Sequence, residues 1–298
     1  MLHVDVLEVV PPLLRDLPLP AVGSTADKHA RGQVLVVGGS RETPGGVLLA
    51  GVAALRVGAG RLQLATAESV AVALALAVPE ARVIGLPEND AGAVSASSAS
   101  ALVIEASGAD AILIGTGALD GDETGRLLCE LLCFVGETTT VIIDAAGLGI
   151  LAQEPALLRR VAERTIVMPN PREMAGLLGC DVGAVDSDPV AALDEAVRHL
   201  GVVVTLRGAE TWTSAPGAPH YRDRSGHAAL GTAGSGDVLA GAITGLSARG
   251  TDPLRAALWS VHCHGIAGEV AAGRGPGVGL LARELLAELP YALRSLEV

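Results

Sequence analysis

The 298-residue chain has very few aromatic residues and only one lysine among its 21 basic residues. Phe, Trp and Tyr make up 2% of the sequence, whereas apolar residues make up 50%, so the hydrophobic core must be aliphatic. Clusters of Lys and Arg are also missing, and the net charge is -12 at pH 7. We therefore expect neither nucleic acid nor an anionic membrane as a partner. An anionic ligand would need backbone N–H groups aimed at it locally.

No two of the four cysteines form a CxxC pair, which argues against a zinc or redox motif. Cys129 and Cys133 lie one helical turn apart in an apolar run, which predicts a buried helix face. The triplet at residues 262–264 (HCH) looks like a metal site, but adjacent side chains of a helix point about 100° apart. We therefore expect this triplet to pack in the core or at a subunit interface. Free thiols fit a reducing cytoplasm.

Long apolar segments are absent as well. The longest aliphatic run, residues 70–78, is far too short to span a bilayer. The first 20 residues contain acids and prolines where a signal peptide needs a basic region and a clean apolar region. These features predict a soluble, cytoplasmic protein without a membrane partner.

Short, continuously apolar runs recur along the chain, and most are separated by segments of helix length. The runs are residues 33–37, 61–65, 110–114, 141–143, 165–167 and 202–206. Such runs are typical of strands in a mainly parallel sheet covered on both faces, so the sequence predicts an α/β fold. Residues 207–220 suggest an antiparallel excursion, and helices dominate after residue 236. No repeat or compositional break divides the chain, so we expect one domain over residues 1–298.

Polar and glycine residues follow the predicted strands where each strand ends. Examples are Gly115-Thr116-Gly117, Asp144, Asn170 and Arg207-Gly208. In open parallel sheets, ligands bind at the carboxyl ends of the strands. We therefore expect these groups to converge on one crevice.

A glycine-rich segment, residues 231–236, precedes an apolar run with helical periodicity. Glycine lets the backbone turn sharply, so several N–H groups point to one place, and the helix start adds partial positive charge. The segment therefore predicts an anion hole suited to phosphate. It is not a Walker A motif, because no Gly-Lys-Ser/Thr follows, and Leu239 replaces the third glycine of a dinucleotide fingerprint.

Asp237 stands at the start of this predicted helix. It could simply stabilise the first helical turn. A carboxylate beside a phosphate hole repels the ligand, however, unless it takes a proton from a hydroxyl group that attacks phosphorus. Asp144 and Glu173 have similar alternatives, since each could orient substrate or Mg²⁺, or only stabilise a turn or helix start. The single lysine, Lys28, is a third candidate for such an orienting role.

The motifs VLVVGGS, GTG, IIDAAGL, PNPREMAGLLG, LRGAET and GTAGSGDVLAG occur in this order. Together they resemble the ribokinase-like NAD(P)H-hydrate dehydratases, which are related to small-molecule kinases. The resemblance spans about residues 28–269, and the segment DKHARGQVLVVGGSRETPGG is the part most similar to the dehydratases. It implies a three-layer α/β/α sandwich with a mainly parallel central sheet.

The resemblance also implies an activity. Members of the family use ADP or ATP, with Mg²⁺, to convert the hydrated form of NADH or NADPH back to the intact cofactor by phosphorylation and elimination. Asp237 corresponds to the catalytic aspartate. The nucleotide would bind Arg207, Gly208, Ala209, Glu210, Thr211, Gly234, Ser235 and Gly236. The hydrate would bind Gly46, Gly117, Asn170 and Asp237.

The chain departs from the family at several of these positions. Asn170 replaces a histidine, Arg207 a lysine and Arg172 a glycine, and Ala146 stands where a second aspartate is usual. Two other interpretations therefore stay open, a small-molecule alcohol kinase and a nucleotide-binding protein without turnover. The family's epimerase domain is not expected in this chain. Its apolar C-terminal helices predict either a larger core or the interface of a homo-oligomer.

Overall fold

The computed structural model describes residues 6–21, 27–273 and 279–297. The described strands form one ten-stranded sheet in the order β1-β10-β9-β8-β7-β6-β5-β2-β3-β4. The strands are β1 (Val6–Glu8), β2 (Gln33–Val37), β3 (Arg61–Ala67), β4 (Ala81–Leu86), β5 (Ala111–Ile114), β6 (Thr140–Ile143), β7 (Thr165–Val167), β8 (Val203–Leu206), β9 (Thr211–Ser214) and β10 (His220–Asp223). Only β9 runs antiparallel to its neighbours, β8 and β10. The predicted, mainly parallel α/β sheet is therefore confirmed.

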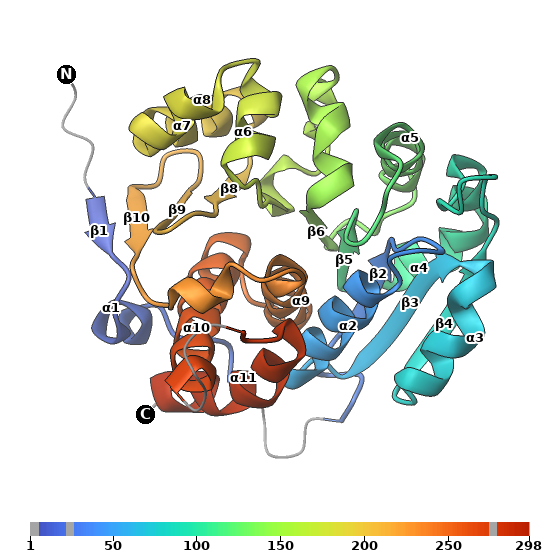
Figure 1. Cartoon of the computed structure of the whole chain (residues 1–298), viewed down its shortest axis with the longest axis horizontal. Helices are drawn as coiled ribbons and strands as arrows, with labels where there is room; N and C mark the ends of the chain where they lie inside the picture. Colours follow the sequence, from blue (N-terminus) through green and yellow to red (C-terminus); the bar gives the residue numbers. More distant parts are fainter. Residues whose placement is uncertain (1–5, 22–26, 274–278, 298) are drawn as a thin grey trace.

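Helices cover both faces of this sheet (Figure 1). The α-helices are α1 (Pro11–Asp16), α2 (Gly45–Arg56), α3 (Glu68–Ala77), α4 (Val103–Gly108), α5 (Gly121–Leu131), α6 (Pro171–Leu178), α7 (Val182–Ser187), α8 (Pro189–Leu200), α9 (Ser235–Ala248), α10 (Pro253–Gly273) and α11 (Ala282–Leu296). Short 3₁₀ turns, among them η2 (Ala145–Ala152) and η5 (Ala228–Leu230), complete the connections. Helices α2, α9, α10 and α11 lie on one side of the sheet, and α5, α6 and α8 lie on the other.

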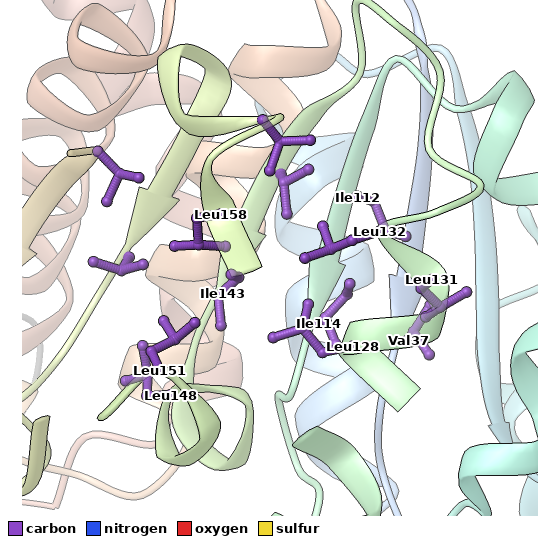
Figure 2. Packing of buried hydrophobic residues seen from close by; sticks show 14 of the residues in the cluster. Val37, Ile112, Ile114, Leu128, Leu131, Leu132, Ile143, Leu148, Leu151 and Leu158 are labelled. Atoms are coloured by element: carbon purple, nitrogen blue, oxygen red, sulfur yellow. The ribbon is translucent and has the colours of Figure 1, made fainter. Parts of the chain in front are cut away.

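The strand residues alternate between two aliphatic cores. Leu35 and Val37 of β2 point to the core shared with α5, α6 and α8, part of which is shown in Figure 2. Val34 and Val36 of the same strand point to the core shared with α2 and α9. Because both faces of β2 are apolar and fully buried, its sequence reads as a continuous apolar run. This arrangement confirms the three-layer sandwich.

Helix α9 is set unusually close to α2 by two glycines. A Cβ atom on Gly241 would lie 2.0 Å from the carbonyl oxygen of Ala50, and one on Gly245 would lie 2.5 Å from that of Ala54. Any larger residue would therefore force the helices apart. The close packing fixes the N-terminus of α9 beside the N-terminus of α2.

Helix α10 decides between the two alternatives left open for the apolar C-terminal helices. Its central residues, including Trp259 and Cys263, are buried in a third aliphatic cluster within the same chain. These apolar residues are therefore core residues. Across the described residues, no helix is both long and apolar enough to cross a membrane.

The sequence did not predict the two outermost strands. β1 has three exposed residues, and in β4 only the last residue, Leu86, is buried. Edge strands lack the continuous apolar run that marked the central strands, which explains why both were missed.

Candidate active site

The glycine-rich turn at residues 231–234 leads directly into α9. Gly234 is the N-cap residue with φ = 89°, a left-handed conformation that favours glycine. Because glycine has no side chain, it offers no capping group to the first N–H groups of the helix. These N–H groups and the positive end of the helix dipole suit an anionic ligand.

Asp237 lies in the first turn of α9 and is partly buried. Thr116, fully buried just past β5, donates a hydrogen bond from its hydroxyl group to Oδ1 of Asp237. Burial raises the pKa of Asp237, whereas the hydrogen bond from Thr116 and the positive charge of Arg207 lower it. The net direction is upward, as expected for a carboxylate that acts as a base.

Two glycines leave the space beside Asp237 free of side chains. A Cβ atom on Gly46 would lie 2.8 Å from Cα of Gly117 and 3.2 Å from Oδ1 of Asp237. Gly117 has φ = 64°, and a Cβ atom there would lie 2.7 Å from the carbonyl oxygen of Thr43. The structure thus brings together Gly46, Gly117 and Asp237, which come from three distant parts of the sequence.

Arg207 contacts two acids, one directly after β6 and one in the first turn of α6. Its Nη2 lies 2.9 Å from Oδ1 of Asp144 and 3.2 Å from Oε2 of Glu173. Burial raises the pKa of Asp144 to about 6; the charge of Arg207 opposes this rise, and Glu173 and Asp237 add to it. Nη1 of Arg207 lies so close to Gly236 that a Cβ atom there would be 2.0 Å away. The guanidinium therefore connects the two acids with the start of α9.

Asn170 caps α6. Its side-chain oxygen accepts hydrogen bonds from the backbone N–H groups of Arg172 (2.9 Å) and Glu173 (3.0 Å). In return, Glu173 accepts a hydrogen bond from the Asn170 N–H, at 2.8 Å, which completes a capping box. This local bonding holds Glu173 beside Arg207, so both Asn170 and Glu173 have a structural role in addition to any contact with a ligand.

The two predicted metal candidates do not form a protein-held magnesium site. Asp144 and Glu173 both contact the same nitrogen of Arg207, so their charges are already paired with a cation. Within the described ranges, no group of three or more His, Cys, Asp or Glu side chains is arranged to hold a metal ion. A protein-held Mg²⁺ therefore does not fit these side chains.

A cavity of about 780 Å³ opens beside the N-terminus of α9. It is lined by residues of the β8–β9 connection, of the segment 225–236, and of α10. The lining includes six of the predicted nucleotide-binding residues: Arg207, Gly208, Ala209, Thr211, Ser235 and Gly236. Asn170, predicted on the hydrate side, also lines this cavity.

Two predicted nucleotide-binding residues, Glu210 and Gly234, do not line the cavity. Gly234 is the N-cap residue of α9, and the carboxylate of Glu210 pairs with Arg224 at 3.0 Å. Lys28 is exposed, and its carbonyl oxygen would be 1.9 Å from a Cβ atom on Gly60, the residue before β3. It therefore lies at the amino ends of the parallel strands, opposite to the predicted crevice. This position separates Lys28 from the other candidates.

His264 was expected only to pack in the core or at an interface. It is buried, but it also lines the cavity, and its Nε2 lies 3.1 Å from Oγ of Ser235. Its neighbour Cys263 points the other way, with Sγ 3.5 Å from the carbonyl oxygen of Leu289. Helical geometry had correctly separated the side chains of the triplet. The apolar helical pattern did not indicate which of the three side chains faces the cavity.

The solved structures place this fold in the ribokinase-like class. A ribokinase-like superfamily protein from Enterococcus faecalis has a TM-score of 0.82, with 21% identity, over 98% of this chain and 96% of its own. An ADP/ATP-dependent NAD(P)H-hydrate dehydratase from Bacillus subtilis, co-crystallised with ATP and Mg²⁺, has a TM-score of 0.80 and 26% identity, with 100% of both chains covered.

The family follows from the sequence comparisons. The pattern of the NAD(P)H-hydrate dehydratase family matches residues 34–291, and the chain belongs to this family. It is 43% identical to an ADP-dependent (S)-NAD(P)H-hydrate dehydratase of Xanthomonas campestris, over 94% of this chain and 93% of that protein. It is 35% identical to a bifunctional NAD(P)H-hydrate repair enzyme of Moorella thermoacetica, over 94% of this chain but only 52% of that protein.

Proposed function

We propose that the protein is an ADP- or ATP-dependent NAD(P)H-hydrate dehydratase, which restores NADH or NADPH from the hydrated form. The observation that carries this proposal is Asp237, a carboxylate with a raised pKa, in the first turn of a helix whose N-terminus is open to an anion. A base beside an anion hole suits the transfer of a phosphoryl group to a hydroxyl group. Family membership and the 43% identical relative support the dehydratase as the specific activity.

In the proposed reaction, Asp237 takes the proton from the hydroxyl group of the hydrate. That oxygen then attacks the terminal phosphoryl group of the nucleotide and displaces AMP from ADP, or ADP from ATP. The new phosphate ester then loses inorganic phosphate, together with a proton from the neighbouring ring carbon, to give the reduced nicotinamide. The backbone N–H groups at the start of α9 balance the negative charge on the transferred group. Gly46 and Gly117 leave room for the hydrate next to Asp237.

The nucleotide would occupy the cavity of about 780 Å³, a volume that suits a small-molecule ligand. Its phosphates would face Ser235, Gly236 and Arg207. Nε of Arg207 is buried with no hydrogen-bond partner among the described residues, so the guanidinium has donor capacity beyond its two acids. We propose that Mg²⁺ enters bound to the nucleotide, because Asp144 and Glu173 are already paired with Arg207.

The test is to incubate the protein with hydrated NADH and either ADP or ATP, and to follow the absorbance of reduced nicotinamide. We expect recovery of NADH only when a nucleotide is present. The same experiment identifies the donor, which the residues of the cavity do not distinguish. If NADH is not recovered and an alcohol is phosphorylated instead, the protein is a small-molecule kinase. Nucleotide binding with neither reaction would show a protein without turnover.

Residues 1–298 would act as a single catalytic domain in the cytoplasm, because all described strands join one sheet and the four cysteines are free thiols. Association into a homo-oligomer stays a prediction, and sedimentation of the purified protein would measure it.

A further inference from the structure

His264 lies on α10 and contacts Ser235, the first residue of α9, which directly follows the glycine-rich turn. Its Nε2 is 3.1 Å from Oγ of Ser235 and also 3.1 Å from the carbonyl oxygen of the same residue. Both residues are buried, with exposed fractions of 7% for His264 and 6% for Ser235. Both also line the cavity proposed for the nucleotide.

The two contacts decide which nitrogen of His264 carries the proton. A carbonyl oxygen only accepts hydrogen bonds, so Nε2 must be the donor. The pKa of His264 is lowered to about 4, mainly by burial and also by the charge of Arg207, whereas the hydrogen bond with Ser235 and the charge of Asp223 oppose the change. The imidazole is therefore neutral near neutral pH and keeps its proton on Nε2.

This tautomer also decides what the Ser235 hydroxyl group does. The N–H group of His264 is shared between two oxygens of Ser235, so the hydroxyl oxygen accepts from the imidazole. The hydroxyl proton must then point away from His264. Because Ser235 is the first residue of α9 and lines the cavity, this proton is available to a ligand there.

We propose that His264 is a positioning residue, which holds Ser235 so that its hydroxyl proton is directed at a phosphoryl group bound at the start of α9. This inference rests on the proposed function for the identity of the ligand, a nucleoside di- or triphosphate. It adds to that function a side chain from α10, a helix that supplies none of the predicted nucleotide-binding residues.

The neighbouring residues of α10 are also shaped to the cavity. A Cβ atom on Gly265 would lie 2.0 Å from Oγ of Ser225, so only glycine lets the segment after β10 approach the helix. One turn of the segment is held by Asp223, whose Oδ2 is 2.7 Å from Nδ1 of His262 and whose Oδ1 accepts from the Ser225 N–H at 2.8 Å. His262 and Gly265 therefore hold the segment after β10, while His264 contacts the start of α9, so α10 supports two walls of the same cavity.

The test uses His264→Leu, which removes the N–H donor, and His264→Gln, whose amide nitrogen can take the place of Nε2. Ser235→Ala and the double variant Ser235→Ala/His264→Leu complete a double-mutant cycle. Two quantities are measured for each protein: the dissociation constant of ADP by calorimetry, and KM and kcat for dehydration of hydrated NADH. Cys263→Ala is the matched control, because Cys263 is a buried residue of the same helix that faces α11 and not the cavity.

We expect His264→Leu and Ser235→Ala each to weaken ADP binding and raise the nucleotide KM about tenfold, as for a lost hydrogen bond to a charged group. The double variant should be no weaker than Ser235→Ala, and His264→Gln should recover most of the affinity. Cys263→Ala should lower the melting temperature without changing the ADP affinity.

The proposal is overturned if a folded His264→Leu protein binds ADP normally, or if the losses of the two single variants multiply in the double variant. It is also overturned if Cys263→Ala weakens ADP binding as much as His264→Leu, because the effect would then be one of helix stability. The calorimetric measurement does not need the dehydratase reaction. If the wild type binds ADP but does not dehydrate the hydrate, the proposed function is contradicted. The ADP affinities of the variants still test the role of His264 in that case.

Discussion

Thr116 and Asp237 are 121 positions apart in the sequence, yet the Thr116 hydroxyl group donates a hydrogen bond to Oδ1 of Asp237. This bond stabilises the charged carboxylate and so lowers its pKa, against the stronger effect of burial. A base must be deprotonated to act, so the rate of dehydration should rise with pH through the pKa of Asp237. Without the hydroxyl group, that rise should move to higher pH.

We therefore predict that Thr116→Val shifts the acid limb of the kcat/KM profile to higher pH and reduces activity most at the acid end. The measurement is the pH–rate profile of wild type and variant under saturating nucleotide. Thr116→Ser keeps the hydroxyl group and should keep the wild-type limb. A Thr116→Val profile that falls equally at every pH would instead mean that Thr116 affects only the packing of the turn.

Asp237→Asn should lower kcat by about 10²- to 10⁴-fold, the range expected for loss of a positioned general base. Asparagine keeps the shape of the side chain and removes a negative charge beside the anion site. ADP should therefore bind at least as tightly as it does to the wild type, and calorimetry measures this. Activity within a few-fold of the wild type would rule out Asp237 as the base.

The sequence predicted that residues at the ends of several strands and one local motif would come together. Asp144, Asn170, Arg207 and the residues before α9 converge as expected, because parallel strands bring their carboxyl ends to one edge. The pairing of Arg207 with Asp144 and Glu173 could not be predicted, since it depends on side chains 63 and 34 positions away meeting in space.

The position of Lys28 could have been predicted from the same rule about strand ends. It precedes the strand at residues 33–37, so it belongs to the amino end of the sheet, whereas its proposed role needed the carboxyl end. His264 shows a different limit, because a buried histidine on an apolar helix has the same sequence pattern whether it faces the core or a cavity.

Relative to the Asp144→Asn variant, the wild-type protein should be more stable in mild acid than near neutral pH. Its pKa is raised from 3.8 to about 6, mainly by burial, so between these values the folded protein binds more protons at this group than the unfolded chain. The free energy of unfolding contributed by Asp144 therefore falls as pH rises through this window and is level above it. Asp144→Asn has no such proton to bind.

The measurement is urea unfolding of both proteins at a series of pH values from about 4 to about 8. The difference in unfolding free energy, wild type minus Asp144→Asn, should decrease with rising pH up to about pH 6 and then stay constant. A difference that increases over the same range would show that Arg207 lowers the pKa of Asp144 below its ordinary value.

Gly45 and Gly46 offer a matched pair of substitutions in the first turn of α2. A Cβ atom on Gly46 would lie 2.8 Å from Cα of Gly117 and 3.2 Å from Oδ1 of Asp237, whereas one on Gly45 would meet no atom within 4 Å. Gly46→Ala should therefore displace the backbone of Gly117 and enter the space of the hydrate, with a loss in kcat/KM of about tenfold or more. Gly45→Ala should keep wild-type kinetics and gain up to about 1 kcal/mol of stability, because alanine restricts the unfolded chain more than glycine.

Steady-state kinetics and thermal unfolding of both variants measure these effects. Equal kinetic losses in the two variants would show that the first turn of α2 tolerates no methyl group at all, and that Gly46 has no special contact with the site.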